Sequence, residues 1–257
     1  MSINPSLLVV IPTFNCEKQI VRLIAKYSSI IELRGIETWI VDNGSSDFTL
    51  DAATRAKKEN KMRNIKIFQT KQNNSLGGTI KIAFNSAVEH GYDYVAILHG
   101  DDQAECHDLL GIWEMVKKGG RNCSILGTRF DSKSKLIGYS YKRIVGNKVL
   151  NMIYSASLRK KLSDLGSGLN LYRVKDLKKV DYMFLSNSLF FNYQLIIHFA
   201  KQKIPFSFYP IIWKELDQKS NAQNFKIFLW ALGVLFIPRL RLSSSTNKAI
   251  YEVKHVA

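Results

Sequence analysis

Short apolar runs alternate along the first half of the chain with segments whose apolar residues recur every three or four positions. Apolar runs without alternation are typical of strands buried on both faces of a parallel sheet, and the longer spacing is typical of amphipathic helices. The pattern predicts repeated βαβ units, hence an α/β fold with a mostly parallel central sheet flanked by helices. The predicted strands are residues 7–11, 37–41, 65–69, 94–98 and 124–126. The predicted helices are residues 17–29, 49–59 and a third that follows Gly78 and runs to Gly91.

The second half of the chain is less regular. Residues 144–157 and 189–201 have helical spacing, and residues 164–168 read as a loop. Residues 206–212 predict a strand, which Pro210 restricts to a sheet edge because proline cannot donate a hydrogen bond to a neighbouring strand.

The run 227–237 contains eleven apolar residues, counting Gly233, and ends beside a basic segment. It is too short for a membrane-spanning helix, which needs about 20 apolar residues. It predicts either a buried helix or an interfacial helix anchored by Trp230 and the flanking basic side chains. We therefore treat residues 223–257 as a separate amphipathic C-terminal segment.

Positive charge is concentrated in the second half. Residues 1–128 contain 15 basic and 14 acidic side chains, residues 129–257 contain 22 and 7, and the whole chain has a net charge of +16. A field of this sign favours nucleic acid, phosphorylated substrates or an acidic membrane surface as partners. Two halves with different binding partners would have this distribution.

The cysteine content and the N-terminal sequence indicate the cellular compartment of the protein. The three cysteines are few and odd in number, which argues against a disulfide framework and favours a reducing compartment. The first residues lack a basic segment followed by an apolar core and a cleavage site, so no secretory signal is expected. These features predict a cytoplasmic protein.

Polar residues follow three of the predicted strands. They are residues 12–15, 42–47 and 99–103. Ligands of open α/β sheets bind at the carboxyl ends of the strands. Asp101, with Asp102 and Gln103, offers the one or two carboxylates that Mg²⁺ or Mn²⁺ needs beside phosphate oxygens, and such an ion would neutralise a pyrophosphate leaving group. The alternative is a polar loop that caps the following helix.

Two further features have a binding and a structural interpretation. Asp42 could accept a hydrogen bond from a nucleobase N–H or a ribose hydroxyl, or act as a loop or N-cap residue, a role that Asp47 could equally fill. Gly77 and Gly78 let the backbone approach a ligand, or form a simple tight turn. The chain contains neither GxGxxG nor GxxxxGK[ST], so dinucleotide-binding and P-loop folds have no support.

Several motifs carry a resemblance to a known family. The first four are 7–15 (LLVVIPTFN), 41–47 (VDNGSSD), 73–78 (NNSLGG) and 99–103 (HGDDQ). Together they resemble family 2 glycosyltransferases with the GT-A fold, in which HGDDQ stands at the place of the Asp-x-Asp motif. Three more are 127–129 (GTR), 142–147 (KRIVGN) and 164–173 (DLGSGLNLYR). These resemble the dolichyl- and polyprenyl-phosphate sugar synthases and their bacterial surface-polysaccharide relatives.

The resemblance implies an inverting transferase that moves a sugar from a UDP- or GDP-sugar to a polyprenyl-phosphate or membrane-associated glycan acceptor, in surface polysaccharide or glycolipid biosynthesis. It implies Mg²⁺ or Mn²⁺ as cofactor and a peripheral position at the anionic inner face of the membrane. Residues 1–222 would form the GT-A domain, in which residues 1–128 hold the nucleotide sugar and residues 129–222, the basic acceptor side, hold the acceptor.

The resemblance also implies roles for single residues. The nucleotide-binding residues would be Pro12, Thr13, Phe14, Asp42, Gly77 and Gly78. The metal-binding residues would be Asp101, Asp102 and Gln103. The acceptor-phosphate residues would be Arg129, Lys142, Arg143 and Ser167. Asp101 and Asp164 would be catalytic, and Asp164 is the candidate base if the acceptor is a sugar hydroxyl. A phosphate acceptor is already ionised and needs little such help.

Three positions depart from the family pattern. His99 replaces the first carboxylate of the Asp-x-Asp motif, Cys16 replaces a common glutamate, and Asn192 stands where relatives often carry an acid. A catalytically impaired sugar-nucleotide-binding protein is therefore one alternative. A basic nucleic-acid-binding protein is a second, but it leaves VDNGSSD and HGDDQ unexplained, so we expect no nucleic-acid partner.

Overall fold

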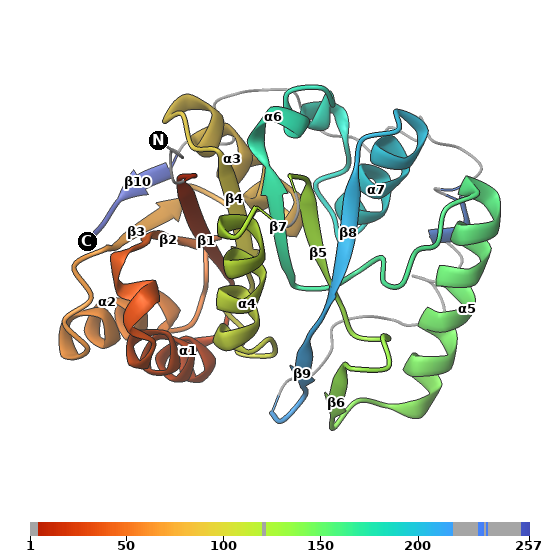
Figure 1. Cartoon of the computed structure of the whole chain (residues 1–257). Helices are drawn as coiled ribbons and strands as arrows, with labels where there is room; N and C mark the ends of the chain where they lie inside the picture. The colour runs from red at the N-terminus through yellow and green to blue at the C-terminus, as the bar shows by residue number, and fades with distance from the viewer. Residues whose placement is uncertain (1–4, 120–121, 218–230, 234, 236–252) are drawn as a thin grey trace.

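The computed structural model has a central sheet with helices on both of its faces (Figure 1). It describes residues 5–119, 122–217, 231–233, 235 and 253–257. Within these ranges an eight-stranded sheet has the order β10-β3-β2-β1-β4-β7-β5-β8, and β6 pairs separately with β9. The strands are β1 (Leu7–Thr13), β2 (Glu37–Asp42), β3 (Ile65–Thr70), β4 (Tyr94–Leu98), β5 (Ser124–Thr128), β6 (Lys135–Ile137), β7 (Leu169–Arg173), β8 (Phe206–Pro210), β9 (Ile212–Lys214) and β10 (Val253–His255).

The helices connect these strands. They are α1 (Glu17–Ser29), α2 (Thr49–Glu59), α3 (Ser75–Glu89), α4 (Cys106–Lys117), α5 (Tyr141–Leu158), α6 (Val174–Leu177) and α7 (Phe191–Lys201), with 3-10 turns η1 (Ile31–Gly35) and η2 (Tyr182–Phe184). The predicted α/β fold with a mostly parallel core is confirmed: β3, β2, β1 and β4 are parallel neighbours. Among the described helices, none combines the length and the apolar character needed to cross a bilayer.

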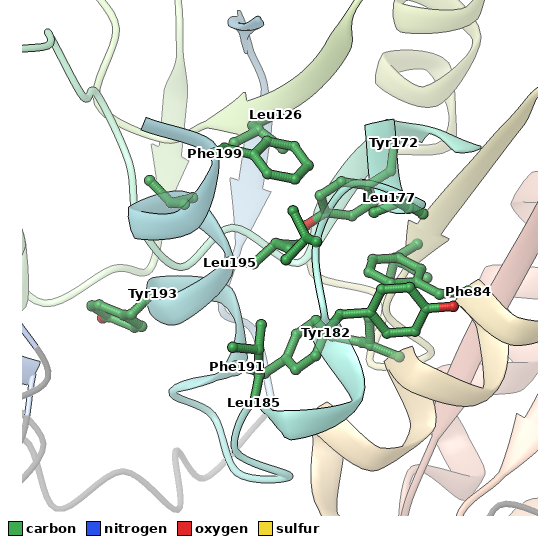
Figure 2. Packing of buried hydrophobic residues seen from close by; sticks show 14 of the residues in the cluster. Phe84, Leu126, Tyr172, Leu177, Tyr182, Leu185, Phe191, Tyr193, Leu195 and Phe199 are labelled. Atoms are coloured by element: carbon green, nitrogen blue, oxygen red, sulfur yellow. The ribbon is translucent and has the colours of Figure 1, made fainter. Parts of the chain in front are cut away.

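The apolar runs form strands that are buried on both faces. In β1, Leu8 and Val10 belong to a core under α3, α5 and α7, whereas Val9 and Ile11 belong to a second core under α1, α2 and α4. Successive side chains of a strand point to opposite faces, so a run without polar interruption supplies both cores. Figure 2 shows part of the first core, where the Phe84 ring meets the Tyr172 ring edge-on at 4.9 Å.

Strand β7 is one of the elements that the sequence pattern did not predict, together with α4, β6, α6 and β10. It lies antiparallel between β4 and β5, with Leu98 opposite Leu169 and Leu126 opposite Asn170. This insertion brings the loop that precedes β7 to the carboxyl end of β4, where the backbone N–H of His99 donates to the carbonyl of Gly168 at 3.1 Å. The second half of the chain thus reaches the ligand-binding edge of the first.

The two edges of the sheet come from late parts of the chain. The predicted edge strand 206–212 divides into β8, which lies at one edge, and β9. At the other edge β10 pairs antiparallel with β3. Most of the predicted segment 223–257 lies outside the described residues, Trp230 included. Of the run 227–237, Ala231 and Leu235 are helical and buried, which agrees with the buried-helix alternative.

Candidate active site

The carboxyl ends of β1, β2 and β4 meet at one point of the sheet edge. Thr13 is in register with Asp42, and the N–H of Asn43 donates to the carbonyl of Thr13 at 2.9 Å. The N–H of Gly100 donates to the carbonyl of Pro12 at 2.9 Å. A Cβ at Gly100 would lie 2.4 Å from the Thr13 side chain, so only glycine lets the β4 loop approach β1 this closely.

A cleft of about 370 Å³ opens at this point. Its lining comes from the loops after β1, β2, β3 and β4 and from the start of α3. The lining residues are Pro12, Thr13, Phe14, Cys16, Asn43, Asn73, Ser75, Leu76, Thr79, His99, Gly100, Asp101 and Leu189. The predicted nucleotide residues Pro12, Thr13 and Phe14 and the predicted metal ligand Asp101 therefore lie around one cavity.

Asp101 and His99 are two ionisable residues of the cleft that could bind a metal ion. Burial raises the pKa of Asp101 to about 7, although the N–H of Gln103 donates to its Oδ1 at 3.2 Å. Burial and the charge of Arg129 lower the pKa of His99 to about 4, so its imidazole is neutral. Its Nε2 atom is buried and has no hydrogen-bond partner in the structure. A neutral imidazole nitrogen and a carboxylate are both ligands that Mn²⁺ accepts.

These two residues fit a divalent cation that is shared with a substrate. The part of the chain that the structure describes contains no group of three or more His, Cys, Asp or Glu side chains able to hold a metal ion. An ion of this kind often uses one or two protein ligands and takes the remainder from phosphate oxygens and water. The cleft therefore suits a metal ion that arrives with a diphosphate.

Asp102 is turned away from the cleft. Its φ is +59°, in the left-handed region, and it is not among the residues that line the cleft. Its carboxylate accepts from Arg22 Nε at 3.0 Å and from Lys26 Nζ at 2.8 Å, both on α1. Gln103 also lies outside the lining. Asp102 thus anchors the loop to α1, and the metal-binding role of Asp102 and Gln103 stays a prediction.

Asp42 lies behind the cleft. It is buried, and its carboxylate accepts from the N–H and the hydroxyl of Ser45 and, at 3.3 Å, from Gln69 Nε2. The sequence analysis missed Asn43 and Asn73, which line the cleft and bond to each other through Asn43 Nδ2 and Asn73 Oδ1 at 3.0 Å. Their place in VDNGSSD and NNSLGG was the available signal.

Gly77 and Gly78 serve packing. Neither lines the cleft. A Cβ at Gly77 would lie 2.5 Å from the Ser186 carbonyl oxygen, and the N–H of Gly78 donates to the Asn187 carbonyl at 3.3 Å. Buried Lys81, one turn along, donates to the Leu185 carbonyl at 2.6 Å and to Asn187 Oδ1 at 2.6 Å. Both glycines lie inside α3 and allow its close approach to the loop before α7, and their contact with a nucleotide stays a prediction.

Substitution of Gly77 by alanine should therefore destabilise the fold by about 1–3 kcal/mol, because the new methyl group meets rigid backbone. Gly146→Ala is the matched control, since it is also a helical glycine and a Cβ there meets nothing within 4 Å. The control should be stabilising by about 0.5–1 kcal/mol, as expected for alanine in a helix. Urea unfolding measures both, and equal changes in the free energy of unfolding would refute the packing role.

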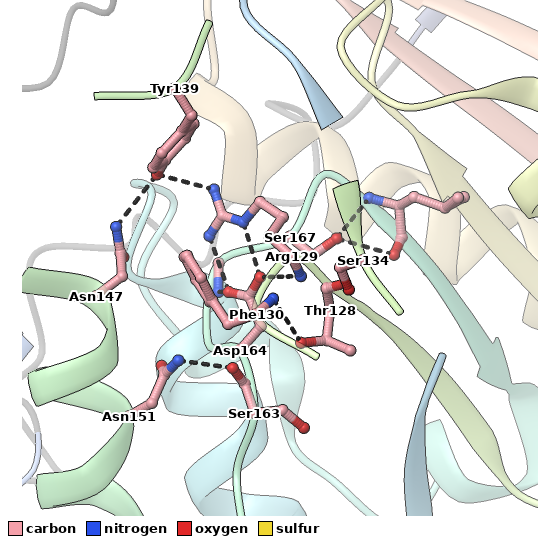
Figure 3. Close-up of polar contacts among 12 residues, drawn as sticks. Thr128, Arg129, Phe130, Ser134, Tyr139, Asn147, Asn151, Ser163, Asp164 and Ser167 are labelled. Carbon is pink, nitrogen blue, oxygen red and sulfur yellow. Dashed lines mark hydrogen bonds and ion pairs between the residues drawn. The ribbon is translucent and has the colours of Figure 1, made fainter. Parts of the chain in front are cut away.

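Two predicted acceptor-side residues bind each other. Arg129 donates to Asp164 through Nε at 2.7 Å, Nη2 at 2.8 Å and the backbone N–H at 3.0 Å, and the Gly166 N–H adds a fourth bond at 3.0 Å (Figure 3). The pair is buried. The Arg129 guanidinium also lies 5.2 Å from the Trp213 ring. The carboxylate of Asp164 is thus fully used, which leaves it poorly placed to act as a base.

The other predicted phosphate ligands differ in availability. Ser167 is buried, and its hydroxyl bonds locally with the N–H and the carbonyl of Leu169. Arg143 pairs with Glu215 at 2.6 Å and stacks on the Tyr139 ring at 4.3 Å. Lys142, at the start of α5, is exposed. Of the four residues, Lys142 is the one whose charged group faces solvent, and Ser167 is committed to the turn before β7.

The sequence comparison decides the family. The model of the family described as "Glycosyl transferase family 2" matches residues 8–181, which is more than half of the chain. The chain belongs to this family. The match spans β1 to α6 and includes all the residues of the cleft except Leu189.

Solved structures agree with this family 2 fold. Glucosyl-3-phosphoglycerate synthase from Mycobacterium tuberculosis, in complex with Mn²⁺, UDP and phosphoglyceric acid, matches with a TM-score of 0.66 at 13% identity, over 93% of this chain and 80% of that one. Mannosyl-3-phosphoglycerate synthase from Rubrobacter xylanophilus matches with 0.63 at 12%, over 92% and 74%. S. aureus TarS 1-349 in complex with UDP-GlcNAc matches with 0.62 at 17%, over 95% and 69%. At these identities the likeness shows the fold.

Proposed function

We propose that this glycosyltransferase transfers a sugar, with inversion, from a UDP- or GDP-sugar bound in the cleft to a phosphate-bearing, lipid-linked acceptor. The observation that supports the nucleotide-sugar donor is that Asp101 and His99, whose buried Nε2 has no hydrogen-bond partner, line one cleft with Phe14 and Asn43. The Mn²⁺ and UDP in the M. tuberculosis enzyme and the UDP-GlcNAc in TarS support a metal-dependent nucleotide-sugar donor.

The chain's own residues have separable tasks in this proposal. Asp101 would hold Mg²⁺ or Mn²⁺, and His99 would be a second ligand for Mn²⁺; the bound ion offsets the charge of the departing diphosphate. Phe14 is 43% exposed at the cleft, where its ring offers a flat apolar surface to the nucleoside. Asp42 orders the loop after β2 through Ser45, and the next residue, Asn43, lines the cleft beside Asn73.

The proposal of a phosphate acceptor rests on the cleft having no carboxylate available to act as a base. Among the cleft-lining residues that the structure describes, Asp101 is the one carboxylate, and it is assigned to the metal ion. Asp164 is held by four hydrogen bonds to Arg129 and Gly166. A hydroxyl acceptor needs a base, whereas a phosphate is already ionised near neutral pH. Exposed Lys142 and the excess of basic residues after position 128 favour a phosphate at an anionic membrane surface.

The experiment uses a matched pair of acceptors, polyprenyl phosphate and the corresponding polyprenol, after a thermal-shift panel of UDP- and GDP-sugars with Mn²⁺ has identified the donor. A donor at 100 times its dissociation constant should stabilise the protein by about 2.7 kcal/mol. Glycosylated product should form with the phosphate and be absent with the alcohol. Equal transfer to both would contradict the proposal that the acceptor must carry a phosphate. Asp164 would then again be the candidate base. A catalytically impaired binder would show the shift without any product.

A further inference from the structure

The outward face of α5 is apolar in a way that the proposed chemistry does not use. Tyr141, Val145 and Met152 are 78%, 43% and 65% exposed, and Lys148 lies exposed between them in the row. Intervals of four, three and four residues place all four on one side of a helix with 3.6 residues per turn. We call these four residues the α5 face. Exposed apolar side chains gathered on one side of a helix mark an interaction surface.

The basic residues of α5 indicate which kind of partner the α5 face binds. The 18 residues of α5 include Lys142, Arg143 and Lys148 but no aspartate or glutamate. Helices that lie in a membrane interface combine an apolar row with flanking lysine and arginine. A second copy of this chain, packed face to face about a two-fold axis, would instead bring Lys148 against its equivalent and repel. An anionic lipid bilayer satisfies both the apolar and the positive components.

The inward side of α5 connects this face to the active site. Asn151 Nδ2 donates to the Ser163 carbonyl at 2.7 Å, next to Asp164 (Figure 3). Asn147 Nδ2 donates at 3.1 Å to the Tyr139 hydroxyl, which also accepts from Arg129 at 3.4 Å. The same loop continues to the Gly168 carbonyl that binds His99 at the cleft. Hydrogen bonds from the inward side of α5 therefore join the helix to the loop that borders the donor site.

We propose that the α5 face docks this enzyme on an anionic lipid bilayer. The presentation of a lipid-linked acceptor to the cleft follows from docking and rests on the proposed function. Docking itself rests on the exposure, spacing and charge of α5 alone. The glycan-acceptor alternative would leave the docking surface unchanged.

The test is co-sedimentation of the full chain with vesicles of phosphatidylcholine, with and without phosphatidylglycerol. The wild type should sediment with the anionic vesicles only. Lys148→Glu should lower the partition coefficient at least fivefold, since one lysine at such a surface contributes about that factor. Tyr141→Ser combined with Met152→Gln should abolish binding. The matched controls Ile31→Asn, at an 80% exposed side chain, and Lys58→Glu, at an exposed lysine of α2, should bind as the wild type does.

Donor-dependent thermal shift and sugar-nucleotide hydrolysis, measured without lipid, show whether each variant is folded and has an intact donor site. Loss of vesicle binding with both readouts retained supports docking through α5. Wild-type protein that ignores anionic vesicles, or α5 variants that bind them as tightly as the controls, overturns it. A wild-type dimer that the α5 variants convert to monomer also overturns it, since the face would then join two copies. If the wild type shows neither a donor-dependent thermal shift nor sugar-nucleotide hydrolysis, the proposed function is contradicted. The vesicle experiment still decides docking, because docking does not depend on the donor.

Discussion

Replacement of Asp101 by asparagine is expected to lower the rate of sugar transfer by about 10²–10³-fold, the range found when one group that stabilises transition-state charge is removed. Asp101 is the carboxylate that lines the cleft at the end of β4. An amide keeps the shape of the side chain but lacks the charge that a divalent cation needs. Initial rates at saturating Mn²⁺ and donor measure the effect. Asp131→Asn, at an exposed carboxylate, is the control and should retain wild-type rates.

The same variant separates chemistry from folding through its pH dependence. Burial raises the pKa of Asp101 from 3.8 to about 7 in the folded chain, so folding favours the protonated form. The stability that this contributes is fully present below about pH 4 and is lost as the pH rises through about 7. Without metal, Asp101→Asn should therefore melt above the wild type near pH 8, and the difference should vanish in acid. A variant that melts below the wild type near pH 8 would mean that the carboxylate supports the fold.

The largest effect on stability is expected at Arg129. Arg129→Ala leaves the buried carboxylate of Asp164 without its main partner, and removal of one member of a buried pair typically costs about 3–5 kcal/mol. The double substitution Arg129→Met with Asp164→Leu removes both charges and should be less destabilised than Arg129→Ala. Urea unfolding gives the three free energies.

Arg143→Ala provides the comparison for this prediction. Its pair with Glu215 is less deeply buried, with side chains 19% and 14% exposed, so we expect a smaller loss than at Arg129. If Arg129→Ala cost no more than Arg143→Ala, the pair would not hold the loop before β7, and Arg129 would be available to a phosphate. A double variant less stable than Arg129→Ala would lead to the same conclusion.

Local pattern was enough to predict the five strands and the first two helices of the first half, but it missed α4 and began α3 after Gly78 instead of at Ser75. Helices α1 and α2 and strand β4 have the predicted bounds, because amphipathic spacing and short apolar runs report burial directly. Strand β7 was missed for a non-local reason. Its five residues follow Gly168 without a distinctive pattern, and its antiparallel place between β4 and β5 depends on pairing with strands more than forty residues away.

The site was predictable in position and less so in detail. Residues at the strand ends were expected to converge, and Thr13, Phe14 and Asp101 do line one cleft. The sequence could not separate Asp101 from Asp102, because only the fold shows that Asp101 lines the cleft while Asp102 pairs with Arg22 on α1. Nor could it show that Arg129 and Asp164, each a plausible ligand-binding residue 35 positions apart, bind each other.

The central claim is that Asp101 and His99 hold a metal ion that is shared with the diphosphate of a sugar donor. Anomalous X-ray scattering from crystals grown with Mn²⁺ and the donor found by thermal shift tests it most directly. We expect one strong manganese peak between the Asp101 carboxylate, His99 Nε2 and the diphosphate oxygens, with the nucleoside against Phe14. A donor bound in the cleft with no peak at Asp101, or a donor bound elsewhere, would contradict it.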